Sequence, residues 1–443
     1  MAIFLFFFSL FLRLYHFPEI EFKLDESLAV LKASQYWLTG KLPLSGLVSS
    51  TLARNPPLFI YLLSPLTIIS SDPLFLTFFF ALSGSLAVWL LYRLLKKFSS
   101  TWAFFSSILF ATSAWPVLFS RKIWAQNLLP LFSIMIIYLA SRLATRKDGK
   151  TVFLLVVLSL WSFQIHFSGI LTIPCLILLF IFLRVRNFKQ IISGLLVGLL
   201  PLTPYLLEQN RSGFRDLALL FSSQRGGYFD FHSFITPFRI GSGFYFARVL
   251  GADYFEFFST LPFRQLIWPV FNLMTLLVGI GLLFSFFKGK KTQVFNFFFL
   301  LMMLVSFLSR RPAMPFYEEL YFTLIFIFAG LALTQLSAIS RYGRLFSGIF
   351  VSLIVFANLV FLFHFYRFVH LKQQIQGDYG LVYSQKKVLI DQFVNRYRLE
   401  SEEKRVRLYG QVIFSNYFYD TEKKNYFPNK ELLPLVNYEL NNF

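Results

Sequence analysis

The chain has 443 residues, of which 56% are hydrophobic, 61 are Phe and only 14% are charged. Soluble proteins carry roughly a quarter charged residues, so this composition excludes an ordinary soluble domain and predicts an integral membrane protein. The formal net charge of +20 comes from short Lys and Arg clusters between apolar segments. Such spacing argues against a single basic face and therefore against a nucleic-acid partner.

Apolar segments recur along the chain from its first residues. A helix needs roughly 20 apolar residues to cross a bilayer. The segments lack the alternating pattern of barrel strands, so we predict an α-helical polytopic membrane protein with about 11 transmembrane helices. The segments fall at about residues 2–17, 74–95, 101–118, 127–141, 152–166, 168–183, 190–207, 264–287, 292–308, 319–337 and 345–366.

Basic residues between the segments give the predicted orientation. Five clusters fall on one side if the segments alternate across the membrane, and the positive-inside rule assigns that side to the cytoplasm. We therefore predict a multi-pass protein of the cytoplasmic (inner) membrane with its N-terminus inside and its C-terminus outside. The clusters are Arg93 with Lys96 and Lys97, Arg142 with Arg146, Lys147 and Lys150, Arg184 with Arg186 and Lys189, Lys288 with Lys290 and Lys291, and Arg341 with Arg344.

Residues 18–73 then form one large external loop. Residues 57–72 are apolar but short and interrupted by proline, which favours a helix at the outer interface or a partly re-entrant one. The adjacent carboxylates Asp25 and Glu26 stand at the start of a helical pattern that ends at Gly40. Because a helix N-terminus favours negative charge, this pair either caps the helix or acts chemically at the membrane surface.

Two basic pairs depart from the positive-inside rule, because they lie in short segments that are predicted to be external. They are Arg121 with Lys122 and Arg310 with Arg311. Each pair either extends towards lipid phosphates or binds an anionic substrate.

The two longest polar stretches are also placed outside. Residues 208–263 are too long for a plain connector and form either a folded cover or a mobile lid over a substrate cavity. From about residue 367, polar residues replace the apolar runs, and the pattern suggests a small external α/β appendage. We therefore divide the chain into a membrane module, residues 1–366, and a C-terminal external domain, residues 367–443.

Signatures of familiar soluble enzymes are absent. The sequence contains no GxGxxG, P-loop, HExxH or CxxC pattern, and its five His residues show no zinc-ligand spacing. No cofactor or resident metal ion is indicated, although a divalent ion is not excluded. Gln164 and His166 lie near the outer end of an apolar segment, where they are either satisfied core residues or part of an external cavity.

Five motifs follow one another on the predicted external side. They are Asp25-Glu26, Leu38-Thr-Gly-Lys-Leu-Pro43, Asn55-Pro-Pro-Leu58, Phe119-Ser-Arg-Lys-Ile-Trp124 with Asn127-Leu-Leu-Pro130, and Gln164-Ile-His-Phe-Ser-Gly169. Their order and spacing resemble the bacterial GT-C glycosyltransferases. The closer resemblance is to glycosyltransferase family 39, with its protein mannosyltransferases and aminoarabinose transferases. It covers about the first 210 residues, and the later helices share only the general layout.

The resemblance implies a GT-C fold, an inverting glycosyl transfer, and a sugar donor joined to an undecaprenyl- or dolichyl-type polyprenyl phosphate. An essential acidic residue lies in the first external loop of that family, which implies this role for Asp25 and secondarily for Glu26. The acceptor would be a lipid, a glycan or a protein. Membrane lipids would surround the enzyme itself. We predict that the external basic residues hold the donor phosphate, because Arg and Lys suit that anion. These are Arg121, Lys122, Arg310 and Arg311, and the predicted cavity residues are Asn55, Trp124, Gln164 and His166.

Other membrane functions share some of these features. A transporter or flippase of lipid-linked sugars would also have many helices, but such proteins place ionisable groups near the bilayer midplane and show related halves. The apolar segments here contain few acidic residues, and no internal repeat is visible. A glycan polymerase or ligase would share both the external cavity and the lipid donor, and the sequence leaves it open.

Overall fold

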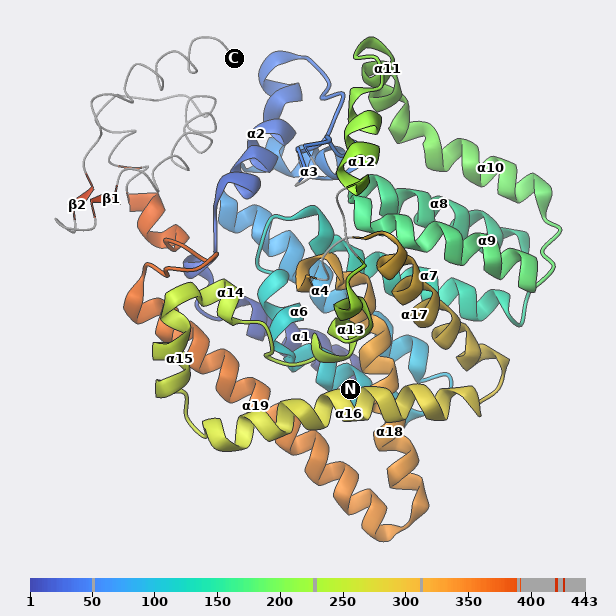
Figure 1. The fold of residues 1–443 in the computed structure, drawn as a ribbon, viewed down its shortest axis with the longest axis vertical. Helices are drawn as coiled ribbons and strands as arrows, with labels where there is room; N and C mark the ends of the chain where they lie inside the picture. The colour runs from blue at the N-terminus through green and yellow to red at the C-terminus, as the bar shows by residue number, and fades with distance from the viewer. Residues whose placement is uncertain are drawn as a thin grey trace.

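The described part of the chain folds almost entirely into helices (Figure 1). The computed structural model describes residues 1–49, 52–225, 229–310, 314–388, 391, 419–420 and 425–426. The predicted class, an α-helical polytopic membrane protein, is confirmed. Six helical segments in the described part of the chain are long and apolar enough to cross a membrane: Pro73–Leu95, Ala125–Leu143, Phe188–Arg211, Arg264–Phe286, Glu319–Ile339 and Arg341–Lys372.

All eleven apolar segments of the sequence are helical, five of them shorter than a full membrane crossing. The helices that they form are α1 (Ala2–Leu14), α4 (Pro73–Leu95), α5 (Ser100–Thr112), α6 (Ala114–Phe119), α7 (Leu129–Leu143), α8 (Gly149–Ile165), α9 (Thr172–Phe182), α10 (Phe188–Leu199), α11 (Thr203–Arg211), α16 (Arg264–Phe286), α17 (Lys290–Leu308), α18 (Phe322–Ile339) and α19 (Arg341–Lys372).

The remaining elements are short. Helices between the apolar segments are α2 (Leu24–Thr39), α3 (Leu58–Ile69), α12 (Arg215–Arg225), α13 (Thr236–Arg239), α14 (Ala247–Leu250) and α15 (Tyr254–Thr260). The 3₁₀ turns are η1 (Phe17–Glu19), η2 (Ala125–Leu128), η3 (Phe167–Leu171), η4 (Leu200–Leu202), η5 (Phe231–Phe234), η6 (Gly251–Asp253), η7 (Pro315–Tyr317) and η8 (Glu319–Tyr321). Strands β1 (Tyr419–Asp420) and β2 (Asn425–Tyr426) pair antiparallel.

One predicted helix is divided in two. The segment expected at 101–118 breaks at Ser113, whose backbone is extended with ψ 136°, and α6 begins after it. Pro116 has no N–H to donate to the carbonyl of residue 112 and its ring crowds that position, which accounts for the break. The Ser113 hydroxyl donates to the Gly241 carbonyl at 3.0 Å, so the break is anchored to the loop before α16.

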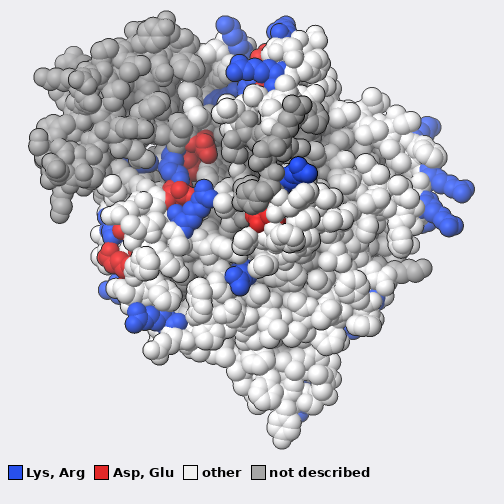
Figure 2. All heavy atoms as spheres, viewed as in Figure 1, with Lys and Arg blue, Asp and Glu red and all other residues white. Residues whose placement is uncertain are grey.

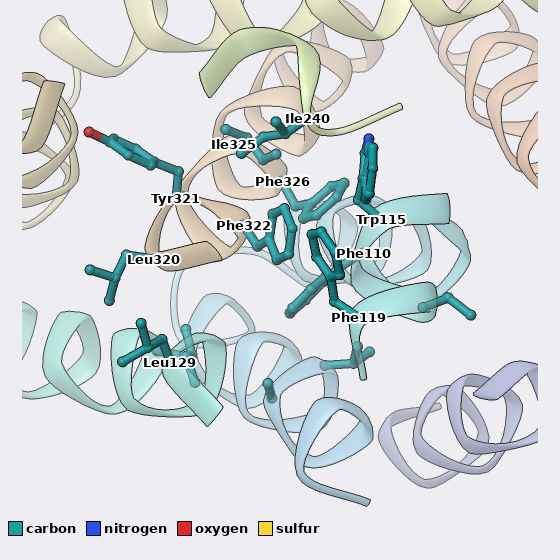
Figure 3. Packing of buried hydrophobic residues seen from close by; sticks show 14 of the residues in the cluster. Phe110, Trp115, Phe119, Leu129, Ile240, Leu320, Tyr321, Phe322, Ile325 and Phe326 are labelled. Atoms are coloured by element: carbon teal, nitrogen blue, oxygen red, sulfur yellow. The ribbon is translucent and has the colours of Figure 1, made fainter. Parts of the chain in front are cut away.

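Helix α18 forms the centre of the bundle. Its residues from Phe322 to Ala329 are all fully buried, and it packs against α5, α16 and α19. Figure 3 shows Phe322 and Phe326 of α18 facing Phe110 and Phe119, and the Phe110 and Phe326 rings stack 5.0 Å apart. Aromatic pairs of this kind add to the van der Waals packing that holds membrane helices together.

Two glycines let neighbouring helices approach α18 closely. A Cβ on Gly330 would lie 2.1 Å from the Ser106 Oγ on α5, and a Cβ on Gly281 would lie 1.8 Å from the Phe328 carbonyl oxygen. Only glycine fits at these distances, as is common where membrane helices meet.

The first long loop and the segment after α19 pack together. Helix α3 is formed within residues 57–72, as predicted, and packs against α2. The last helix continues to Lys372, beyond the boundary predicted at 366, and residues 373–388 then return to the first loop (Figure 1). Most of the predicted C-terminal α/β appendage lies outside the described residues, so its division from the membrane module stays a prediction.

Candidate functional site

The carboxylate pair singled out in the sequence lies at the start of a helix, as predicted. Helix α2 begins at Leu24, and the Lys23 backbone N–H donates to the Glu26 Oε2 at 3.0 Å. This bond satisfies an amide that the first turn of a helix leaves unpaired. Gly40 closes the helix in the left-handed conformation with φ 69°, and its N–H donates to the Tyr36 carbonyl at 2.8 Å.

The two carboxylates occupy different environments. Asp25 is exposed, whereas Glu26 is fully buried. Burial, together with the negative charge of Glu21, raises the pKa of Glu26 to about 7, although Lys23 and Lys122 oppose the shift. Desolvation by the surrounding protein, together with the charge of Glu21, also raises the pKa of Asp25, whereas Lys23 and Lys122 act in the opposite direction. Asp25 can therefore meet a substrate, while Glu26 caps the helix.

A third carboxylate, Glu21, links two lysines beneath this helix start. Glu21 is 1% exposed, and its two oxygens pair with Lys23 and Lys122. Burial disfavours the charged form of Lys23, but the adjacent carboxylates outweigh it and raise its pKa. Neither the pairing of Glu21 with Lys122 nor the place of Lys23 could be read from the sequence, because Lys122 is a hundred residues away.

The segment after α19 covers the same cluster from the other side. The Tyr383 N–H donates to the Ile20 carbonyl at 2.9 Å, and Glu21 forms a β-bridge with Val382. Lys386 is 1% exposed and donates to the Phe22 carbonyl. Burial lowers the pKa of Lys386 to about 8, although Glu26 and Glu21 act in the opposite direction. Figure 2 shows acidic and basic side chains gathered on this face between α2 and α14, while the surface over α18 is almost uncharged.

Aromatic rings surround the buried lysine of the cluster. Lys122 is 3% exposed, and its ammonium group lies 4.6 Å from the Trp124 ring centre. The Phe316 ring meets Trp124 edge-on at 6.2 Å. Glu319, which is 1% exposed, also lies within electrostatic range of Lys122. Its Oε1 atom has no hydrogen-bond partner among the described residues. The predicted residues Lys122 and Trp124 thus lie in one cluster with the helix start.

The chain is similar to known proteins in part of its sequence and in its fold. Residues 54–207 match the model of the dolichyl-phosphate-mannose-protein mannosyltransferase family. The chain is similar to ArnT from Cupriavidus metallidurans bound to undecaprenyl phosphate, with 14% identity, a TM-score of 0.50, and coverage of 99% of this chain and 76% of ArnT. The apo form of that ArnT gives 11% identity, a TM-score of 0.51, and coverage of 82% and 74%. The Archaeoglobus fulgidus oligosaccharyltransferase, in a complex with Zn and sulfate, gives 12% identity, a TM-score of 0.50, and coverage of 82% and 52%.

This chain has the GT-C fold. The resemblance stated from the motifs is therefore confirmed at the level of the fold. No curated protein sequence matches the chain. The matched segment begins at Arg54, so it includes the Pro-Pro motif and the Arg121-Lys122 pair but not Asp25.

Some of the predicted site residues of this GT-C chain are occupied by contacts with the protein itself. Arg121 is 1% exposed, and its Nη1 and Nη2 donate to the carbonyls of Tyr15 and His16, the latter at 2.7 Å. The Asn55 side chain donates to the Leu47 carbonyl at 3.0 Å. The Gln164 side chain donates to the Gly198 carbonyl at 2.6 Å. These three side chains therefore hold backbone carbonyls of the protein itself.

The other predicted residues lie towards the surface. His166 caps the start of η3, where its Nδ1 is 2.8 Å from the Ser168 hydroxyl, and its ring stacks with Tyr317 at 6.2 Å. Arg310 is exposed, with its guanidinium 4.5 Å from the Phe229 ring centre. Arg311 lies outside the described residues. Of the predicted residues that the structure describes, Asp25, Glu26, Lys122 and Trp124 lie in one cluster, and the proposed roles of all the predicted residues stay predictions.

The long loop at 208–263 is folded where it is described. It carries α12 to α15, and it is joined to the first loop through Arg54. The Arg54 guanidinium is 3.0 Å from the carboxylates of both Glu208 and Asp216. Asp216 is 2% exposed and also accepts from Gln209. This ion-pair network supports the folded-cover interpretation of the loop in the described residues.

Proposed function

We propose that this protein is a membrane glycosyltransferase that moves a sugar from a polyprenyl-phosphate donor to an acceptor at the outer face of the cytoplasmic membrane. The observation that carries the proposal is an exposed carboxylate, Asp25, held at a helix start beside a buried lysine, Lys122. The GT-C fold supports it, since an ArnT with this fold is described bound to undecaprenyl phosphate. The match to a family named for a dolichyl-phosphate-mannose donor supports the same donor chemistry.

The reaction requires one proton to move and one bond to break. The hydroxyl or amine of the acceptor attacks the anomeric carbon of the sugar, and the bond from that carbon to the phosphate oxygen breaks. The electron pair leaves with the polyprenyl phosphate. Asp25 accepts the proton of the nucleophile. Its raised pKa makes it a stronger base than an ordinary aspartate, and the charges of Lys23 and Lys122 favour its ionised form.

The leaving phosphate gains negative charge and needs a cation in a shielded place. Lys122 is the best candidate, because its charge acts on Asp25 and its ammonium group lies against the Trp124 and Phe119 rings. To hold the phosphate, Lys122 would release its ion pair with Glu21. Interactions with charge are stronger away from bulk water. Arg121 contributes by fixing the backbone at Tyr15 and His16. Arg310 is exposed and suits an earlier encounter with the phosphate group.

The test is a transfer assay with the purified full-length protein and radiolabelled polyprenyl-phosphate sugars. Asp25→Asn keeps the shape of the side chain and removes the base, so we expect the transfer rate to fall by about 10²- to 10⁴-fold. The control is Glu256→Gln on α15, which removes an exposed carboxylate paired with Lys372 at the end of α19 and should leave transfer unchanged.

Two results would count against the proposal. Wild-type transfer by a folded Asp25→Asn protein would refute the assignment of the base. Failure of the wild-type protein to use any polyprenyl-phosphate sugar, together with transfer from a nucleotide sugar, would refute the donor class.

A further inference from the structure

Three side chains of the kinds that bind metal ions meet where the first and last apolar helices end. His16 follows α1, Glu19 is the last residue of η1, and His370 lies in the last turn of α19. One ligand atom from each residue lies within 4.8 Å of the other two. The His16 Nδ1 is 3.0 Å from the Glu19 Oε2, and the His370 Nδ1 contacts the other oxygen of the same carboxylate.

We propose that His16, Glu19 and His370 bind a zinc ion. Two imidazole nitrogens and one carboxylate oxygen form a known zinc ligand set, with a fourth position left for water. With bonds of about 2.0–2.2 Å, ligand atoms around a tetrahedral ion lie about 3.3 Å apart. The His16–Glu19 distance is close to that value, and the whole group spans 4.8 Å. Small side-chain movements would therefore suffice to enclose an ion.

The backbone of the two N-terminal ligands is held in place. His16 adopts a left-handed conformation with φ 49° and ψ 44°, which is uncommon for a residue with a side chain. Arg121 donates to the His16 carbonyl at 2.7 Å, and the Tyr379 hydroxyl donates to the Glu19 carbonyl at 2.5 Å. Supporting bonds of this kind hold the backbone from which the ligands project, and a fixed ligand set binds an ion with less loss of freedom.

The cluster also offers a path for an ion. The His370 side chain is 52% exposed and the His16 side chain 28%, whereas the Glu19 side chain is 10% exposed. An ion can thus enter from the surface beside His370 and reach a carboxylate that is shielded from water. The rings of His16 and His370 are already 4.9 Å apart.

Zinc at this position would connect the ends of the first and last apolar helices. Glu19 is six residues before Asp25 in the sequence, and His370 lies in the last turn of the helix that leads into residues 373–388. The ion would hold the first loop against that segment without touching the reacting groups. The inference does not depend on the glycosyltransferase proposal, since the ligands and the test concern metal binding alone.

The experiment measures metal bound to the full-length protein in detergent. The protein is stripped with a chelator, incubated with Zn²⁺, separated from free ion, and analysed by mass spectrometry for several metals. We expect about one zinc per chain. His370→Ala should lose this zinc, because it removes one of three ligands. His364→Ala is the matched control, since His364 lies on the same helix and is near Thr260 instead of Glu19.

Cobalt provides a second readout that does not depend on activity. Co²⁺ bound by these ligands in a tetrahedral arrangement gives visible absorption in the wild-type and His364→Ala proteins and not in His370→Ala. Equal zinc binding by His370→Ala and wild type would overturn the proposal. Absence of stoichiometric zinc from a folded wild-type protein would also overturn it, and retention of a different metal through the same residues would refute the assignment to zinc.

Discussion

Glu26→Gln tests the electrostatics of the helix start through the stability of the protein. Glu26 is fully buried, and its pKa in the folded protein is about 7 instead of 4.5. At about 1.4 kcal/mol per pH unit, ionising this carboxyl inside the protein costs about 3 kcal/mol. The folded pKa is raised, so the cost is absent near pH 4.5, grows as the pH rises to 7, and is complete above it. Gln stays neutral, and its carbonyl can still accept the Lys23 N–H.

We therefore expect Glu26→Gln to be about as stable as wild type near pH 4.5 and more stable by about 3 kcal/mol at pH 8. With the unfolding entropy typical of globular proteins, this corresponds to a rise of about 3 °C in the melting temperature of a chain of this length. The measurement is thermal unfolding in detergent across pH 4.5–8. Glu256→Gln, at an exposed carboxylate, should show no comparable trend. An effect of Glu26→Gln that is the same at both ends of the pH range would refute the reasoning.

Two further predictions concern packing and the folded loop. Gly281→Ala places a Cβ 1.8 Å from the Phe328 carbonyl oxygen, so we expect a loss of about 1–3 kcal/mol and a lower melting temperature. Arg54→Ala leaves the carboxylate of Asp216, which is 2% exposed, without its cation, and we expect a loss of about 2 kcal/mol in the same assay. Gly279→Ala, two residues away with nothing within 4 Å, should be neutral or slightly stabilising.

The control for Arg54→Ala is Arg248→Ala, because the Arg248 ion pair with Asp378 is more than half exposed on both sides. Exposed ion pairs contribute about 0–1 kcal/mol, so this variant should remain close to wild type. Equal melting temperatures for the Arg54 and Arg248 variants would show that the buried ion-pair network stabilises the protein no more than the exposed pair does. Equal effects of the two glycine changes would contradict the close contact between α16 and α18.

The features that could be predicted from the sequence depend on local patterns. Apolar runs identified the helices, and the residues after Lys23 identified the start of α2 and its end at Gly40. The break at Ser113 was missed because the apolar run continues through it, and only Pro116 signals the interruption. Helix α19 extends beyond 366 because its last turns remain buried as far as Val369 despite the polar residues among them.

The candidate site was harder to predict, because its parts come from distant segments. Asp25 and Lys122 were each noted for their own neighbours. The carboxylate that joins the lysines, Glu21, is buried, but no sequence signal separates it from an exposed glutamate. Arg121 resembled an exposed phosphate ligand, whereas its guanidinium donates to two backbone carbonyls. The same limit applies to His16 and His370, which are 354 residues apart and share Glu19.

The position of residues 373–388 changes how the candidate site should be understood. The resemblance to glycosyltransferases covers the first half of the chain, yet the helix start at Asp25 is braced by the segment that follows the last helix. Lys386 donates to the Phe22 carbonyl, and the Tyr383 N–H donates to the Ile20 carbonyl at 2.9 Å. Because Glu26 and Glu21 also act on the charge of Lys386, this segment contributes to the electrostatics of the carboxylate cluster as well as to its position. We therefore expect changes in residues 373–388 to alter the proposed reactivity of Asp25 through the position of the helix start, without any direct contact with the substrate.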